Sequence, residues 1–185
     1  MALDALIAAL PAPAAANWVV ALSLAAPHVL YAFIWFFPKR WQAWFGKQSV
    51  ERFETAAWLL KGVQFSSVIV WYLSHSGGRF SLLSIPLPAA LVGAVLVAGG
   101  QALNVGIYRA IGHAGVYYGF KLGHSVPWVN GFPFNVVSHP QYVGSVLSIW
   151  GVALFAWGQA PPALPWLVAY WTLLYVITGI QEDKF

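Results

Sequence analysis

The sequence contains no cysteine in its 185 residues, which excludes disulfide bridges, thiolate nucleophiles and cysteine-bound zinc. It also has no Walker-type phosphate loop and no GxSxG element, which argues against a P-loop nucleotide hydrolase and a serine hydrolase. Its histidines have neither HxxxH nor HExxH spacing, and we therefore predict no bound metal.

Charge is scarce as well. Charged residues make up 8% of the chain, whereas they are about 25% of an average soluble domain. The net charge of +4 is spread thinly along the chain, and this distribution predicts no nucleic-acid partner. Hydrophobic residues reach 60%, with 11 tryptophans and a mean hydropathy of +0.70, which predicts an integral membrane protein.

A membrane-spanning helix needs about 20 mostly apolar residues, and the chain has five such segments. They lie at residues 17–37 and at about 56–74, 86–108, 140–157 and 163–180. The short proline-rich stretch "GQAPPALP" joins the last two, which should form a helical hairpin. We therefore predict an all-α, membrane-embedded bundle of about five transmembrane helices, forming one domain over residues 1–185.

Two flanking segments differ from these spans. The stretch "PKRWQAWFGK" mixes tryptophan with basic residues, which is typical of a membrane interface. Residues 1–16 carry Asp4 as their single charge and lack the basic start of a secretory signal. We expect these residues to form an interfacial or frayed arm rather than a cleaved signal.

The basic residues predict which way the bundle faces. With five spans, eight of them fall on one side of the membrane and only Arg79 on the other. The eight are Lys39, Arg40, Lys47, Arg52, Lys61, Arg109, Lys121 and Lys184. Because basic residues concentrate on the cytosolic side, we expect the N-terminus outside and the C-terminus in the cytosol.

Residues 109–139 form an unusually long connection on that predicted cytosolic side. Four glycines there recur every three or four residues: Gly112, Gly115, Gly119 and Gly123. Glycine at helical spacing allows close approach either by a neighbouring backbone or by a flat ligand. Spacing alone leaves both interpretations open.

Polar residues lie where the chain enters the predicted hairpin and where it leaves it, on the same side of the membrane. Pro140 suits the first helical turn, with His139 before it and Tyr142 after it. Glu182 and Asp183 emerge from the last span on the same side, either as a cation site or as solvated charges. Three further polar residues fall on one face of the third span and either join helices or line a pocket: Gln101, Asn104 and Tyr108.

Together, "RAIGHAGVYYGFKLG", "GFPFNVVSHPQYVGS" and the acidic pair closing the hairpin resemble the phosphatidylethanolamine N-methyltransferase family. The resemblance covers roughly residues 100–185, and the isoprenylcysteine carboxyl methyltransferases share the HPxYxG and acidic-pair layout. It implies that this half binds S-adenosylmethionine as methyl donor, with S-adenosylhomocysteine as product and no metal. One departure is Asp183, where many relatives have a second glutamate.

Carried over residue by residue, the resemblance implies a cofactor-binding site. Candidates for the proton acceptor and for the lipid-binding residues are added from the chemistry of methyl transfer. The cofactor residues are Gly112, Gly115, Tyr118, Gly119, Gly123, His139, Tyr142, Gly144, Glu182 and Asp183. Methyl transfer needs a neutral amine and an acceptor for its proton, for which the candidates are His124, His139 and Glu182. We assign Gln101, Asn104, Tyr108 and Trp128 to the lipid substrate.

The resulting prediction is an S-adenosylmethionine-dependent enzyme that methylates mono- and dimethylated phosphatidylethanolamine towards phosphatidylcholine, a step of phospholipid biosynthesis. Its partner would be a phospholipid within the bilayer, and a homodimer is left open. In a eukaryote we expect a multi-pass protein of the endoplasmic reticulum membrane. The alternatives are an isoprenylcysteine carboxyl methyltransferase-like enzyme and a non-enzymatic small transporter or assembly subunit.

Overall fold

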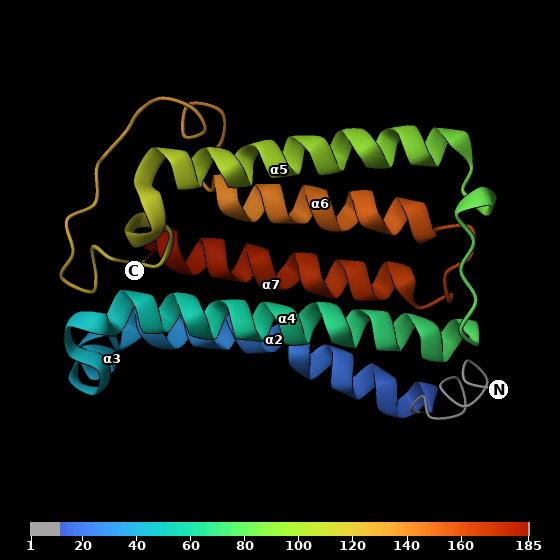
Figure 1. Cartoon of the computed structure of the whole chain (residues 1–185), viewed down its shortest axis with the longest axis horizontal. Coiled ribbons are helices and arrows are strands. Elements are labelled where there is room, and N and C mark those ends of the chain that lie inside the picture. Colours follow the sequence, from blue (N-terminus) through green and yellow to red (C-terminus); the bar gives the residue numbers. More distant parts are fainter. Residues whose placement is uncertain (1–11, 185) are drawn as a thin grey trace.

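The structure is a computed structural model that describes residues 12–184, and within this range it is all-helical. Five long helices run roughly parallel or antiparallel to one another (Figure 1). They are α2 (Pro13–Phe36), α4 (Ser49–Ser76), α5 (Leu87–Val116), α6 (Pro140–Ala156) and α7 (Leu164–Lys184). A short helix α3 (Pro38–Phe45) and the 3-10 turns η1 (Gly46–Gln48) and η2 (Leu82–Ser84) lie in the connections.

The predicted all-α class is confirmed, and four helical stretches are long and apolar enough to cross a membrane. These are α2, the stretch containing α3 and α4, α5 and α7. The predicted fourth span, α6, is apolar but has only 17 residues, or about 26 Å at 1.5 Å per residue. This is slightly less than the roughly 30 Å of a hydrocarbon core. Of the predicted arm, residues 1–11 lie outside the described residues, and residues 13–16 begin α2.

Prolines and glycines set several helix ends. A proline occupies the first or second position of α2, α3, α5 and α6, where its missing N–H costs no helical hydrogen bond. Helix α4 ends at Gly77, which adopts φ 61° and donates its N–H to the Leu73 carbonyl. Such left-handed C-caps favour glycine because it has no Cβ.

One end of the bundle collects the segments that the sequence assigned to the cytosol. Helix α3, the connection between α5 and α6, and the C-terminus all lie at the left end in Figure 1. The connections after α4 and α6 lie at the opposite end, and α6 and α7 form the antiparallel hairpin expected from their short linker. Lys61 lies further along α4 and donates to the Tyr175 hydroxyl at 2.6 Å.

Paired glycines hold α5 against α6. A Cβ on Gly93 or on Gly151 would lie 2.7 Å from the carbonyl oxygen of the other, and one on Gly144 would lie 2.6 Å from the Gly100 oxygen. The two glycines on α5 are seven residues apart, as are the two on α6, so each set lies on one face of its helix. The two backbones therefore approach at positions that only glycine allows, as is common between membrane helices.

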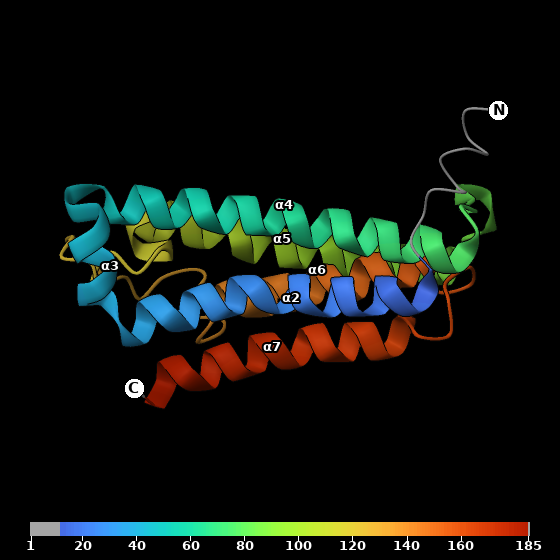
Figure 2. The same cartoon turned by 90° about the horizontal axis from the view of Figure 1, so that it is seen from below.

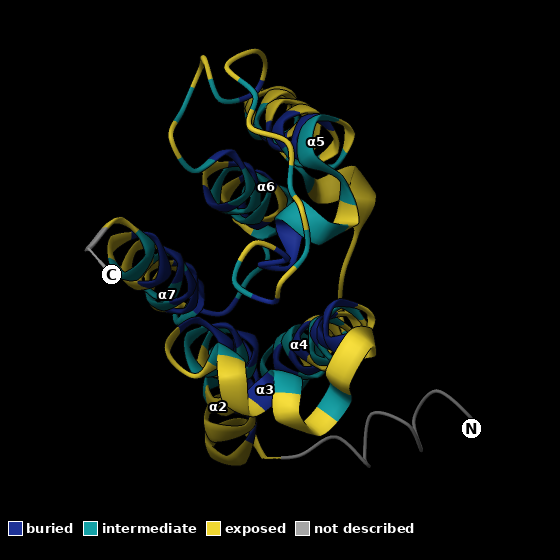
Figure 3. Cartoon of the chain, turned by 90° about the vertical axis from the view of Figure 1, so that its left-hand side faces the viewer, coloured by how far each residue is buried: buried dark blue, intermediate teal, exposed yellow. Residues whose placement is uncertain are grey.

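The segment between α5 and α6 closes one end of the bundle. Viewed from this end, α5 and α6 lie on one side, α2 and α4 on the other, and the connection runs between them (Figure 3). Its buried members Tyr117, Tyr118 and Leu122 pack with Tyr31, Phe53 and other residues of α2 and α4 in one core cluster. This packing links the two halves of the chain where the polar residues gather.

Candidate active site

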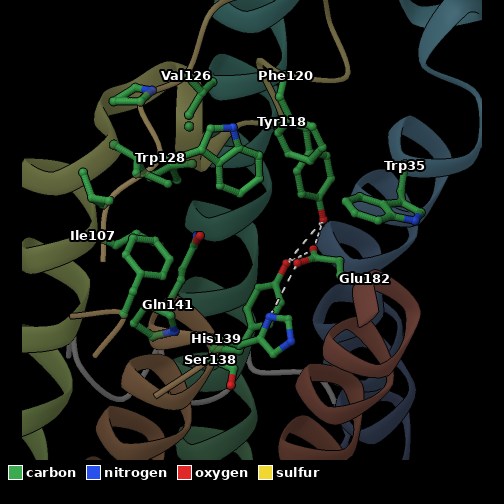
Figure 4. A pocket seen from close by; sticks show the side chains of 18 residues that line it. Trp35, Ile107, Tyr118, Phe120, Val126, Trp128, Ser138, His139, Gln141 and Glu182 are labelled. Carbon is green, nitrogen blue, oxygen red and sulfur yellow. Dashed lines mark hydrogen bonds and ion pairs between the residues drawn. The ribbon is translucent and has the colours of Figure 1, made fainter. Parts of the chain in front are cut away.

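A cavity of about 270 Å³ lies beneath the connection between α5 and α6 (Figure 4). Its wall is mainly apolar and aromatic, and residues of α2, α5, the connection, α6 and α7 contribute to it. The side chains used below are Trp35, Tyr118, Trp128, His139, Tyr142 and Glu182. An apolar cavity with a few converging polar groups is the usual form of a small-molecule site.

Glu182 is the polar centre of this cavity. Its carboxylate accepts hydrogen bonds from the hydroxyls of Tyr118 and Tyr142, and these two oxygens lie 3.3 Å apart. The Glu182 side chain is only 14% exposed although it lies in the last turns of the chain. Hydrogen bonds from two phenols favour the charged form of such a carboxylate.

The backbone of the connection aims Tyr118 at Glu182. Helix α5 is broken at Gly112, with φ 66°, and Tyr118 itself adopts φ 53°. A left-handed conformation costs a tyrosine about 1–3 kcal/mol, which surrounding contacts must offset. The ring is 4% exposed and packs edge-to-face against Tyr31 and Trp35, with centroids 5.4 and 5.2 Å away.

The Tyr118 hydroxyl remains a donor across the physiological range. Its burial, and then the negative charge of Glu182, raise the pKa of the phenol well above its ordinary value. The group therefore stays protonated beyond the ordinary tyrosine pKa of about 10. The Tyr118 hydroxyl can therefore donate to the Glu182 carboxylate at any physiological pH.

Gly119 is required by the turn that carries Tyr118. Its N–H donates to the Ala114 carbonyl at 2.6 Å, and a Cβ at this position would lie 2.6 Å from the same oxygen. Adding a methyl group must therefore shift the turn, at a cost of about 1–3 kcal/mol.

We expect Gly119→Ala to reduce methyl transfer roughly tenfold or more by displacing Tyr118. Initial rates with labelled donor measure the effect, and thermal unfolding in detergent checks that the bundle persists. Gly131→Ala is the matched control, because nothing lies within 4 Å of a Cβ at that position of the same connection. Equal rates for the two variants would contradict a positioning role for Gly119.

His139 lies between the two carboxylates that close α7. Its Nε2 is 2.9 Å from Asp183 Oδ1, and its Nδ1 is 3.8 Å from Glu182 Oε2. Because an ionised carboxylate only accepts, Nε2 carries the proton in this bond, and Nδ1 of a neutral ring keeps its lone pair. His139 is also the N-cap residue of α6, but its side chain makes no capping bond.

The start of α6 positions His139 and Tyr142 together. Pro140 begins the helix and is fully buried, which fixes the turn against the core. One helical turn then separates the two side chains, whose rings stack at 5.7 Å with an interplanar angle of 16°. The predicted proline start thus brings an imidazole and a phenol to the same carboxylate.

The comparison with protein families identifies the chain's relationships. The model of the phospholipid methyltransferase family matches residues 88–185, just over half of the chain. The chain belongs to this family. Most of the cavity wall lies inside the matched region, whereas Trp35 on α2 lies outside it.

Several relatives carry the name phosphatidyl-N-methylethanolamine N-methyltransferase. The proteins from Arabidopsis thaliana, Emericella nidulans and Saccharomyces cerevisiae are 40%, 39% and 40% identical over 106, 102 and 95 residues. These alignments cover 57%, 54% and 51% of this chain, but 60%, 48% and 45% of the relatives. The chain thus spans about half the length of the curated relatives it matches. No solved structure matches it significantly.

Six residues predicted from the sequence line the cavity of this family member: Gly115, Tyr118, Trp128, His139, Tyr142 and Glu182. Trp128 is 91% exposed although it lines the cavity. Three other predicted glycines shape the connection instead, with Gly112 and Gly123 at positive φ and Gly119 in its turn.

The remaining predicted residues lie elsewhere. Gly144 faces Gly100 in the α5–α6 contact, and Asn104 Oδ1 would lie 3.1 Å from a Cβ on Gly144. The Tyr108 hydroxyl is 2.7 Å from that of Tyr117, and Gln101 lines a separate hollow on α5. Two more do not line the cavity: Asp183, whose side chain is 65% exposed, and His124.

Sequence reasoning missed the aromatic wall supplied by Trp35. Its ring is 8% exposed and meets Tyr118, more than 80 residues away in the chain. The first span is apolar and aromatic throughout, so no local pattern distinguishes this tryptophan from those facing lipid. That Trp35 forms part of the cavity wall is visible only in the tertiary structure, where it lies beside the segment between α5 and α6.

The residues present fit an organic cation. A buried carboxylate beside the faces of Trp35 and Tyr118 offers both ion pairing and cation–π attraction. Within residues 12–184, no group of three or more His, Cys, Asp or Glu side chains could hold a metal ion. A carboxylate among aromatic rings is suited to a positively charged organic ligand.

Proposed function

We propose that this chain is an S-adenosylmethionine-dependent phospholipid N-methyltransferase. It converts mono- and dimethylated phosphatidylethanolamine towards phosphatidylcholine. Family membership and the names of the relatives support this reaction. The observation that carries the proposal is the largely buried Glu182 carboxylate, held by two tyrosine hydroxyls in an aromatic cavity.

The cavity offers a place for the methyl donor. S-adenosylmethionine supplies a methyl group bound to a positively charged sulfur. Glu182 would pair with the donor's cationic groups, while Tyr118 and Trp35 provide aromatic faces. Gly115 lies on the cavity wall, where a Cβ would come within 2.5 Å of the Ile111 side chain. Holding both reactants in line supplies much of the acceleration.

The site must also generate a neutral amine. An alkylammonium with a pKa near 10 is neutral in about one molecule per thousand at pH 7, which costs about 4 kcal/mol. The apolar wall disfavours the charged form of the amine. His139 is placed to accept the released proton, because its Nδ1 lone pair faces the cavity beside Glu182.

His139→Gln is expected to lower kcat about a hundredfold, the range usual for loss of a general base. The deficit should shrink at high pH, because the substrate amine then loses its proton without help. Rates of methyl transfer from pH 6 to 10, compared with wild type, measure both effects. His124→Gln is the control, since His124 does not line the cavity. A pH-independent deficit would remove the base role.

In the bilayer, we propose that the chain crosses with all five long helices, α6 included. The end that carries the cavity, the basic residues and the C-terminus then faces the cytosol, where the donor is made. The lipid headgroup reaches the cavity from that face while its tails stay in the membrane. Location in the endoplasmic reticulum and a homodimer remain predictions, which fluorescence microscopy and detergent-corrected mass measurement would test.

Labelled S-adenosylmethionine tests the reaction directly. The purified chain in lipid nanodiscs would receive phosphatidylethanolamine or its mono- or dimethyl derivative, and separately a farnesylated cysteine. Label in the phospholipids supports the proposal and ranks the three methylation steps. Label in the farnesylated cysteine alone would favour the carboxyl methyltransferase layout, and failure to bind donor would favour a non-enzymatic role.

A further inference from the structure

One cation lies beside the cavity without lining it. The Nζ atom of Lys121 sits 3.5 Å from the centroid of the Trp35 ring, while Trp35 itself forms part of the cavity wall. Lys121 therefore lies at the rim, against a side chain of the cavity wall. A cation over an indole face is held in place by the ring quadrupole.

Aromatic contacts link this rim to the acidic centre. The Trp35 ring meets Tyr118 at 5.2 Å, and Tyr118 donates to Glu182. Burial lowers the pKa of the Lys121 ammonium, and the negative charge of Glu182 acts in the opposite direction. Lys121 thus contacts one ring of this edge-to-face pair, and Glu182 contacts the other.

Lys121 has its charge available for an anion. Among the acidic side chains of residues 12–184, none places a carboxylate oxygen within ion-pair distance of its ammonium. Its described partner is the neutral Trp35 ring. A cation with no carboxylate neighbour at the rim of a site can accept an anionic part of a ligand.

We propose that Lys121 binds the phosphate of the lipid substrate while the amine of the same headgroup occupies the cavity beside Glu182. This inference rests on the proposed function and adds the residue that selects a phosphate-linked amine. In an ethanolamine headgroup, two carbons separate the amine nitrogen from the phosphate ester oxygen. The phosphate can therefore contact a cation at the rim while the amine reaches the methyl donor held beside Glu182.

The surroundings of Lys121 favour the lipid phosphate over the carboxylate of the methyl donor. Phe120 next to it is 46% exposed, and its ring lies 6.1 Å from that of Trp35. In the segment that follows α2, at the same end of the bundle, the Arg40 guanidinium lies 5.1 Å from the Phe37 ring. Aromatic side chains mixed with cations are typical of the headgroup layer of a membrane, where lipid phosphates reside.

The test compares two substrates in Lys121→Met and Lys121→Arg. One is monomethylated phosphatidylethanolamine, and the other is an amphiphile with the same N-methylaminoethyl end but no phosphate. We expect Lys121→Met to raise KM for the phospholipid about ten- to hundredfold, as for loss of a charged hydrogen bond. Its kcat and its donor affinity should stay near wild type, and Lys121→Arg should restore much of the phospholipid KM.

For the phosphate-free amphiphile, wild type and Lys121→Met should have the same KM. Lys47→Met is the matched control, because it removes an exposed positive charge at the same end of the bundle, away from the cavity. A weakened donor affinity in Lys121→Met would assign the lysine to the donor carboxylate and overturn the inference. Unchanged KM values, or equal losses on both substrates, would also overturn it.

The same experiment separates this inference from the proposed function. If wild type methylates the phospholipid but Lys121→Met leaves its KM unchanged, only the phosphate contact is wrong. If wild type transfers no methyl group to any phospholipid, the proposed function fails and the inference fails with it.

Discussion

Glu182→Gln should weaken binding of S-adenosylmethionine by about two hundredfold to a few thousandfold and reduce methyl transfer accordingly. Glutamine has nearly the same shape, so the change removes the charge and leaves the volume. Losing one partner of a buried ion pair costs about 3–5 kcal/mol because the other charge stays uncompensated. Here the uncompensated charge is that of the bound cation. Equilibrium binding of labelled donor in detergent measures the loss.

Glu54→Gln is the matched control for this variant. Glu54 also contacts a histidine at the same end of the bundle, with Oε1 2.7 Å from His113 Nδ1, but it does not line the cavity. The affinity of Glu54→Gln for S-adenosylmethionine should stay within about twofold of wild type, because a surface ion pair contributes little. Unchanged affinity in Glu182→Gln, or an equal loss in both variants, would remove Glu182 from the donor site.

The second large effect is expected on stability, from Gly100→Leu. Gly100 is buried where α5 meets α6, and any side chain there meets the Gly144 backbone and Ser148. Backbone atoms cannot move aside as a flexible side chain would, so the helices must separate. Overpacking costs about 1–3 kcal/mol or more, and about 3 kcal/mol corresponds to roughly 10 °C in Tm for a chain of this size. Thermal unfolding in detergent measures the shift.

The neighbouring glycine provides the control. Nothing lies within 4 Å of a Cβ on Gly99, which is exposed on the outer face of α5. Gly99→Leu adds the same apolar side chain one position away and should change Tm by only about 2 °C or less, as for surface substitutions. A similar Tm for Gly99→Leu and Gly100→Leu would show that close packing of α5 on α6 does not stabilise the bundle.

Residue Gly144 shows why local motifs only partly predict the site. It follows the proline-led turn of α6, and the family resemblance assigned it to the cofactor. In the structure its position is occupied by the backbone of α5, 2.6 Å from where a Cβ would lie. Spacing identifies a close approach by some group but not which group approaches, because backbone and ligand impose the same requirement.

The acidic pair at the end of α7 also shows what the sequence predicts and what it leaves undecided. Sequence reasoning treated Glu182 and Asp183 as one feature, since they are adjacent in the chain. Consecutive residues on a helix point about 100° apart, and the structure turns Glu182 into the cavity while Asp183 stays largely exposed beside His139. The choice between them depends on how α7 is rotated against α6.

The sequence by itself determined the helical class, the apolar segments, the short hairpin and the gathering of basic residues at one end. These features follow from composition and spacing along the chain, because lipid demands long apolar helices whose backbone bonds are satisfied internally. The tertiary structure alone decided that Trp35 faces Tyr118, that Glu182 meets two phenols, and that Lys121 covers the indole. Such contacts join residues far apart in the chain, and the rotation and close approach of whole helices set them.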